Sequence, residues 1–236
     1  MNPRVLAIDT TSEFGSIALV EGDRVLEEVA LDSPEGFAHL VFPAIAALLA
    51  RHGLELAQLD AFAGAAGPGS FTGVRVGLTA VKGLAEGVGR PAVGVSNLRA
   101  LAWFGSRALR APVVDARRGA VYGAVYDAAL RRVREESVAP FREWMAALPD
   151  GAIELITNGC SLDEHAVTIP VVRAPRYLAG AVGRIAAAQL AGGPAAGSSA
   201  GDPGELDANY VRRADAELAW KDPAASREEE AMERPD

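Results

Sequence analysis

Alternation of apolar and polar residues near the start of the chain predicts three consecutive strands. They cover residues 4–9, 15–20 and 24–31, with short turns at residues 10–14 and 21–23. The first two strands should pair as a hairpin, because only a few residues join them. The chain therefore begins with an antiparallel β-meander.

The spacing of apolar residues then becomes helical. Residues 34–51 predict an amphipathic helix, in which Pro43 should produce a bend. The apolar positions that recur three or four residues apart are Phe37, Leu40, Val41, Ala44, Ile45, Leu48 and Leu49. A strand at 61–66, a helix at 72–87 and a strand at 92–95 complete a β-β-β-α-β-α-β lobe.

The second half repeats this plan with strands at 111–115, 120–126 and 131–138, further strands at 153–157 and 168–172, and a helix at 177–190. The sequence thus predicts an α/β fold of two actin-like, ribonuclease H-like lobes, each a mixed sheet with flanking helices. We expect the lobes at residues 1–105 and 106–220, with a glycine-, alanine- and serine-rich linker at 191–204. Residues 221–236 should form a disordered acidic tail.

Composition narrows the class of protein. Half of the 236 residues are hydrophobic, as in globular proteins, and the single cysteine fits a reducing compartment. We expect no signal peptide and no apolar run of the ~20 residues that a membrane span needs, and therefore a cytoplasmic protein. The net charge is −8 and the arginines are scattered, which argues against direct binding of nucleic acid.

Residues 67–77 read Gly-Pro-Gly-Ser-Phe-Thr-Gly-Val-Arg-Val-Gly and lead from a strand into a helix. Such a turn exposes backbone N–H groups at a helix N-terminus, the usual setting for a phosphate. The sequence matches neither the Walker A pattern nor the dinucleotide fingerprint, because Thr72 stands where each requires another residue and no lysine follows Gly73. Phosphate binding stays one hypothesis.

Close packing is the other hypothesis for the same glycines. Each glycine inside a helix costs roughly 1 kcal/mol relative to alanine. Gly73, Gly77 and Ala80 form a smooth stripe at spacings of four and three, which favours the close approach of another backbone or of a partner.

Several motifs together resemble the TsaB family, also called YeaZ, over roughly residues 4–213. They are Ile8-Asp9-Thr10-Thr11, the glycine turn at 67–77, Gly94-Val95-Ser96-Asn97-Leu98, Asp115-Ala116-Arg117-Arg118-Gly119-Ala120-Val121-Tyr122 and Tyr210-Val211-Arg212-Arg213. The resemblance implies an actin-like ATPase fold and a role in threonylcarbamoylation of the adenosine beside the anticodon of tRNAs. It also implies a non-catalytic partner of the transferase TsaD, acting with a TsaE-like ATPase.

A catalytic relative is expected to carry two metal-binding histidines three residues apart on the first helix. Here His39 stands alone, with Gly36 and Phe42 at the positions three away, so no metal site is expected. The chain also departs from its relatives at Phe37, where many carry histidine. Alternative functions are an ATP-dependent small-molecule kinase and a glycoprotease-like metallopeptidase.

The sequence gives two candidate sites and no catalytic residue. The expected interface for TsaD, which should also support a homodimer when TsaD is absent, comprises Phe37, Leu40, Val41, Gly73, Val76, Gly77, Ala80 and Leu84. A possible vestigial nucleotide site with weak ATP or ADP binding comprises Asp9, Thr10, Thr11, Gly67, Gly69, Ser70, Asp115 and Arg117. Contact with tRNA is expected only through the complex.

Overall fold

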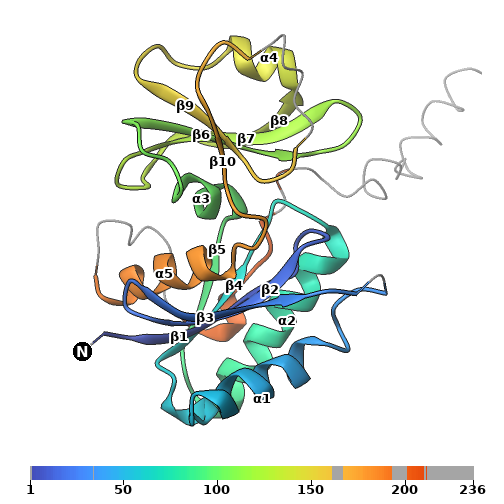
Figure 1. Cartoon of the computed structure of the whole chain (residues 1–236), viewed down its shortest axis with the longest axis vertical. Helices are drawn as coiled ribbons and strands as arrows, with labels where there is room; N and C mark the ends of the chain where they lie inside the picture. The colour runs from blue at the N-terminus through green and yellow to red at the C-terminus, as the bar shows by residue number, and fades with distance from the viewer. Residues whose placement is uncertain (1, 34, 161–166, 193–200, 210, 212–236) are drawn as a thin grey trace, which may run out of the picture.

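The computed structural model contains two five-stranded mixed sheets with the same strand order (Figure 1). The structure describes residues 2–33, 35–160, 167–192, 201–209 and 211. The first sheet has the order β3-β2-β1-β4-β5, with β1 (Arg4–Asp9), β2 (Gly15–Glu21), β3 (Arg24–Leu31), β4 (Ala61–Ala65) and β5 (Ala92–Val95). The second has the order β10-β9-β6-β7-β8, with β6 (Leu109–Asp115), β7 (Ala120–Asp127), β8 (Arg132–Pro140), β9 (Ile153–Thr157) and β10 (Val171–Arg173).

Each sheet begins with an antiparallel meander and continues with two parallel strands. β1 pairs antiparallel with β2 and parallel with β4, and β6 pairs in the same two ways with β7 and β9. This repetition confirms the predicted two-lobed, actin-like α/β class and the predicted first hairpin.

Helices separate and cover the two sheets. They are α1 (Val41–Arg51), α2 (Phe71–Val88), α3 (Asn97–Ala102), α4 (Phe141–Ala146) and α5 (Ala179–Leu190), with short 3-10 turns η1 (Leu56–Gln58) and η3 (Pro203–Glu205). In Figure 1, α1 and α2 lie on one side of the first sheet, α3 and α5 lie between the sheets, and α4 lies on the far side of the second sheet.

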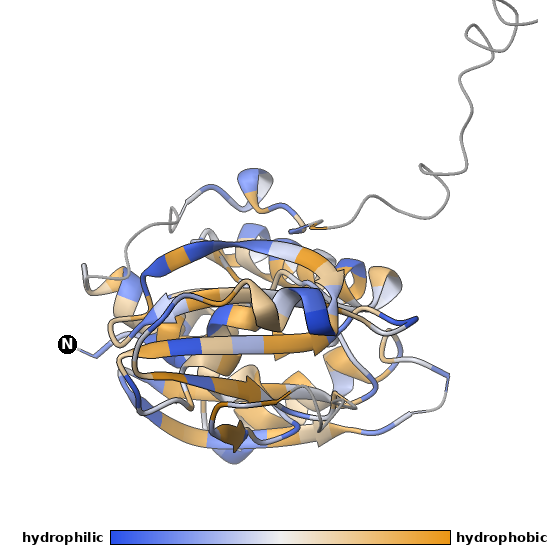
Figure 2. Ribbon diagram, turned by 90° about the horizontal axis from the view of Figure 1, so that it is seen from above, coloured by the Kyte–Doolittle hydropathy of each residue, from blue (hydrophilic) through white to orange (hydrophobic). Residues whose placement is uncertain are grey.

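Alternation along the strands explains this layering, because successive side chains point to opposite faces. In β1, Val5 and Ala7 join the core between the sheets, whereas Leu6 and Ile8 join the core beneath α1 and α2. Since both faces are covered, inner strands such as β1 and β4 are buried and mostly apolar, whereas the edge strand β8 carries several charged residues; Figure 2 shows both colours on the strands. A third cluster, with Trp144 at its centre, fills the space under α4.

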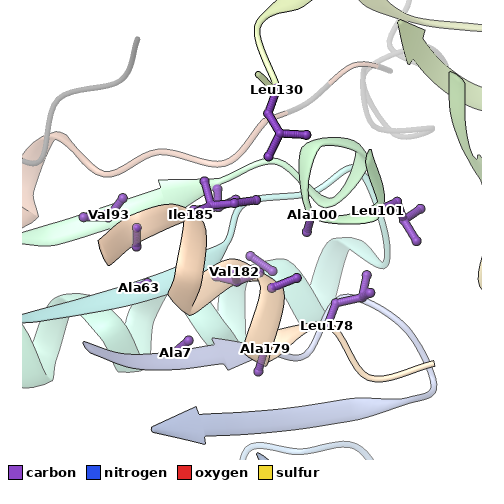
Figure 3. Close-up of a cluster of buried hydrophobic side chains, with 14 of the residues drawn as sticks. Ala7, Ala63, Val93, Ala100, Leu101, Leu130, Leu178, Ala179, Val182 and Ile185 are labelled. Carbon is purple, nitrogen blue, oxygen red and sulfur yellow. The ribbon is translucent and has the colours of Figure 1, made fainter. Parts of the chain in front are cut away.

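Helix α5 packs against the first sheet although it follows the second one in the chain. Its Ala179, Val182 and Ile185 contact a layer that includes Ala7 and Val93 (Figure 3). At its N-terminus, Ala179 N donates to Ser16 Oγ at 3.2 Å and Gly180 N donates to Glu28 Oε1 at 3.0 Å. The first lobe is therefore built from two separate stretches of the chain, and the predicted boundary between residues 105 and 106 stays a prediction.

Some predicted boundaries were wrong. The helix predicted from residue 34 begins at Val41, because the preceding residues form turns in which Gly36 has a φ of 90°. Pro43 lies in the first turn of α1, where its missing N–H costs nothing, so it is not a mid-helix breaker.

The short helices α3 and α4 were not predicted. Pro34, part of the predicted linker and the predicted acidic tail lie outside the described residues.

Candidate functional site

The glycine turn joins the end of β4 to the start of α2. The Gly67–Pro68 peptide is cis, and Gly67 has a φ of 97°, a conformation that favours glycine. Ser70 is the N-cap of α2, and its hydroxyl accepts a hydrogen bond from Gly73 N at 3.3 Å. The predicted strand, turn and helix are thus present in this order.

The turn after β1 packs directly against this glycine turn. Ser70 N donates to Thr11 O at 2.6 Å, and Thr10 Oγ1 donates to Gly73 O at 2.7 Å. A Cβ added to Gly73 would lie 1.9 Å from Thr10 O, and one added to Gly69 would lie 2.5 Å from Thr11 O. Glycine is required at both positions because no side chain fits between the two backbones.

The close approach expected at Gly73 and Gly77 therefore comes from the chain itself. A Cβ on Gly77 would lie 2.7 Å from Thr10 Oγ1, whereas Gly83 and Gly87 have no described atom within 4 Å of an added Cβ. Gly73 and Gly77 on the inner face of α2 therefore allow it to pack against Thr10, whereas Gly83 and Gly87 lie on its open outer face.

A buried polar network lies behind the same turn. Asp9 is 1% exposed, and its Oδ1 accepts hydrogen bonds from Thr11 N at 2.9 Å and from Thr11 Oγ1 at 2.6 Å. Asn97, at the start of α3, donates from Nδ2 to Thr11 Oγ1 at 2.6 Å and accepts from Gly67 N at 2.9 Å. Burial raises the pKa of the Asp9 carboxyl, although the hydrogen bonds from Thr11 act in the opposite direction.

These contacts use two backbone donors of the glycine turn within the chain. Gly67 N and Ser70 N, two donors that an anion would use, are bonded to Asn97 and Thr11. The space beside Gly69 and Gly73 is filled by the turn after β1. The predicted vestigial nucleotide site at this turn, with weak ATP or ADP binding, stays a prediction.

The last two residues of the predicted nucleotide site lie at the corresponding end of the second sheet. Asp115 ends β6, is exposed, and accepts a hydrogen bond from Arg117 N at 2.7 Å. Arg117 and Arg118 have φ values of 66° and 55°, so the turn holds two bulky residues in the left-handed region. The bond from Arg117 N shows that the Asp115 side chain caps its own turn.

The second candidate site is an apolar groove between α1 and α2. Its volume is about 450 Å³, and its lining residues are Ala38, Val41, Phe42, Phe71, Thr72, Arg75, Val76, Thr79 and Ala80. Phe42 is 53% exposed and Phe71 is 43% exposed, which is unusual for side chains of this size. The Arg75 guanidinium lies over the Phe71 ring, 3.8 Å from its centroid.

The predicted interface residues divide between this groove and the interior. Val41, Val76 and Ala80 line the groove. Phe37 and Gly77 are buried inside the chain, and Leu40 and Leu84 are half-buried beside the core under α1 and α2. The structure also exposes His39. Whether a partner contacts these residues stays a prediction.

Sequence reasoning missed three exposed side chains of the groove, which are Phe42, Phe71 and Arg75. The helical pattern selects residues that face the core, so an aromatic residue outside the apolar stripe of its helix goes unnoticed. A large aromatic residue outside the apolar stripe is itself a signal of a surface contact, and it would have identified Phe42 and Phe71. Asn97 belongs to one of the family motifs, but no pattern in the sequence predicts its contact with Thr11.

Among the residues that the structure describes, no group of three or more His, Cys, Asp or Glu side chains is arranged to hold a metal ion. Nor does any helix in those residues have the length and apolarity to cross a bilayer.

Comparison with known proteins first places the chain in a class. Residues 33–192 match the family model of TsaD, the tRNA N6-adenosine threonylcarbamoyltransferase. The solved structure of YeaZ from Pseudomonas aeruginosa superposes with a TM-score of 0.71 at 27% identity, covering 88% of this chain and 99% of that one. The chain is therefore a two-lobed actin-like protein related to the threonylcarbamoyltransferases.

Two curated relatives narrow the family. The chain is 30% identical over 227 residues to the tRNA threonylcarbamoyladenosine biosynthesis protein TsaB of Bacillus subtilis, covering 92% of this chain and 97% of that protein. It is 39% identical over 127 residues to TsaB of Escherichia coli, covering 52% of this chain and about half, 54%, of that protein. The chain belongs to the TsaB family, which confirms the resemblance seen in its motifs.

Proposed function

We propose that this chain acts in the biosynthesis of threonylcarbamoyladenosine in tRNA, as a non-catalytic partner of a TsaD-like threonylcarbamoyltransferase. Its membership of the TsaB family supports the pathway, because the relatives are named as biosynthesis proteins of this modification. The match to the transferase family model supports the partner. Two proteins of one fold can pack through equivalent surfaces as a pseudo-symmetric pair.

The groove between α1 and α2 is the observation that carries this proposal. Its apolar lining and the exposed rings of Phe42 and Phe71 form a surface that is costly to leave in water. Aromatic residues and arginine are enriched in the centres of protein interfaces, and the stacked pair Phe71 and Arg75 has this composition. We assign this groove as the docking surface for the TsaD-like enzyme, with Val41, Val76 and Ala80 as its floor.

The remaining parts of the proposal follow from this surface. The same groove would pair two copies of the chain when the enzyme is absent, because a patch on a twofold axis contacts itself. A TsaE-like ATPase would join the complex, and tRNA would be contacted through the assembled complex. The protein would act in the cytoplasm, where tRNA is modified.

A charge placed in the groove tests the docking surface. Phe42→Glu should weaken binding to the TsaD-like enzyme at least about 30-fold in calorimetry, the loss expected for a central aromatic residue. Val133→Glu is the matched control, because Val133 is 55% exposed on β8, far from the groove in the fold, and should leave affinity within about twofold. Unchanged affinity in Phe42→Glu would reject this docking surface.

Reconstitution tests the function itself. The chain, the TsaD-like enzyme and the TsaE-like ATPase are combined with tRNA, and transfer of the threonylcarbamoyl group is measured with each protein left out. Omitting this chain should abolish transfer, and Phe42→Glu should reduce it where Val133→Glu does not. Full transfer without this chain would show that it is not a required partner.

A further inference from the structure

After α5 the chain returns to the first lobe, where residues 201–209 run along it as a strap (Figure 1). Gly201 O accepts a hydrogen bond from Ala92 N at 3.3 Å, and the Lys82 ammonium donates to Gly204 O at 3.4 Å. Leu206 is 8% exposed and lies against Gly94, where an added Cβ would come within 2.9 Å of Leu206 Cδ1. The strap therefore docks on β5 and α2 through one buried leucine.

The last residue of the strap connects the two lobes. Asn209 N donates to Ala66 O at 2.8 Å, beside the glycine turn, and Asn209 Nδ2 donates to Glu136 Oε2 at 2.5 Å. Glu136 belongs to β8, in the second sheet.

The same carboxylate binds two further groups. Glu136 Oε1 accepts from Ser96 Oγ at 2.5 Å and from Tyr126 OH at 2.8 Å. Ser96 is the N-cap of α3 and Tyr126 lies in β7. One half-buried carboxylate thus joins the strap, the start of α3 and the second sheet.

The strap is held much more weakly than the elements around it. Its regular structure is the three-residue turn η3, and its buried apolar anchor is Leu206, whereas α5 is buried along nearly its whole length. Segments with few buried contacts open locally while the rest of a protein stays folded. A hydrogen bond to a charged acceptor is stronger than one between neutral groups, so Glu136 is the contact on which closure of the strap depends.

We propose that residues 201–209 form a releasable strap that clamps the second sheet to the first lobe, with Glu136 as the positioning residue that holds Asn209. When the strap is closed, Asn209 fixes β8 next to the glycine turn. When it opens, Leu206 leaves its place beside Gly94 and the contact between β8 and the strap is lost. The clamp is a property of the isolated chain and does not depend on the proposed partner.

A charge exchange at the clamp provides the test, read by hydrogen–deuterium exchange of the purified full chain. Asn209→Asp places two carboxylates opposite each other, and exchange in residues 201–209 and in the β7–β8 peptides should become roughly tenfold faster. Glu136→Gln alone should speed exchange in the same peptides by only about two- to threefold, because the Asn209 amide can turn over and accept from the new amide but the bond is then between neutral groups. In the double variant the introduced amide donates to the introduced carboxylate, so exchange should return to the rate of the unmodified protein.

Asn158→Asp is the matched control, since the Asn158 side chain makes an exposed bond to Arg176 O at 3.5 Å. It should not change exchange in either region. Faster exchange in Asn209→Asp confined to residues 201–209 would overturn the clamp, because the strap would then not hold the second sheet. Unchanged exchange everywhere, or no recovery in the double variant, would overturn it as well.

Discussion

In the first sheet, the turn after β1 is enclosed by a glycine turn, a long helix and Asn97, whereas in the second sheet the turn after β6 lies on the surface. Asp9 and Asp115 end equivalent strands, but the first is 1% exposed and the second is open to solvent. The described residues also differ in what comes after the fourth strand of each sheet. β4 leads into α2, while the described residues between β9 and β10, 158–160 and 167–170, contain no helix.

In the first lobe, the two faces of one helix contribute to the core and to the proposed docking surface. Helix α2 uses its inner face to enclose the turn after β1 and its outer face to line the groove. In the described part of the second lobe, the six-residue α4 lies over the outer face and covers Trp144 and the core around it. The proposed docking surface therefore lies on the first lobe, and the described residues of the second lobe offer no equivalent long helix although both lobes have the same strand order.

The largest expected effect comes from filling the contact between α2 and the turn after β1. Gly73→Ala should destabilise the protein by at least about 3 kcal/mol in urea unfolding, because the new methyl group would overlap Thr10 O and backbone cannot move aside cheaply. Gly83→Ala, on the outer face of the same helix, should stabilise it by about 1 kcal/mol, since alanine is the better helix former. Equal effects at both positions would contradict the division of α2 into two faces.

A smaller loss is expected from the buried amide that joins the glycine turn to the turn after β1. Asn97→Ala removes the acceptor of Gly67 N and the donor to Thr11 Oγ1, so it should cost about 2 kcal/mol in the same assay. Asn158→Ala, which removes one exposed bond, should change stability by less than about 0.5 kcal/mol. If both variants lose the same small amount, the first turn is no more tightly enclosed than the second.

The sequence predicted the sheets well because alternation is a local property of the strands. β1 and β9 begin and end at the predicted residues, and both meanders are present. The start of α1 was wrong because Phe37 keeps the helical spacing yet is buried against Gly15 from a turn. The packing of α5 on the first sheet was not predictable either, since periodicity identifies a buried face but not the surface that covers it.

The candidate sites were less predictable than the fold for a related reason. Glycines in a helix indicate a close contact but do not say whether the other backbone belongs to the same chain, and here Thr10 provides it. Phe42 and Phe71 depart from the apolar stripe, so the pattern that found the helices excluded the exposed part of their common groove.

The open turn of the second sheet should gain stability from glycine. Arg117 has a left-handed backbone conformation, which costs a non-glycine residue roughly 1 kcal/mol of folding free energy. Arg117→Gly removes this strain, so the melting temperature should rise by about 2–4 °C. Arg142→Gly serves as the control, because Arg142 lies in α4 and glycine weakens a helix, which should lower the melting temperature. A loss of stability in Arg117→Gly would show that the arginine side chain makes a contact worth more than the backbone strain.

The smallest effect distinguishes the buried carboxyl from the exposed one by its dependence on pH. Because burial raises the pKa of Asp9 above its value in the unfolded chain, ionisation of Asp9 opposes folding at neutral pH. Its unfavourable contribution disappears as the pH falls through the raised pKa toward the ordinary value near 3.8. Asp9→Asn removes the negative charge but keeps an oxygen that can accept the two hydrogen bonds from Thr11.

Asp9→Asn should therefore melt about 1–2 °C above the unmodified protein at pH 7, and this difference should shrink toward zero at pH 4. Asp115→Asn is the matched control at the end of β6 and should stay within about 1 °C of the unmodified protein at either pH, because its carboxylate is exposed. A lower melting temperature for Asp9→Asn at pH 7 would mean that the ionised carboxylate stabilises the enclosed turn. The buried charge of Asp9 would then stabilise the turn after β1 through its hydrogen bonds. Asp9 and Asp115 would differ in the strength of these bonds and not in the cost of burying a charge.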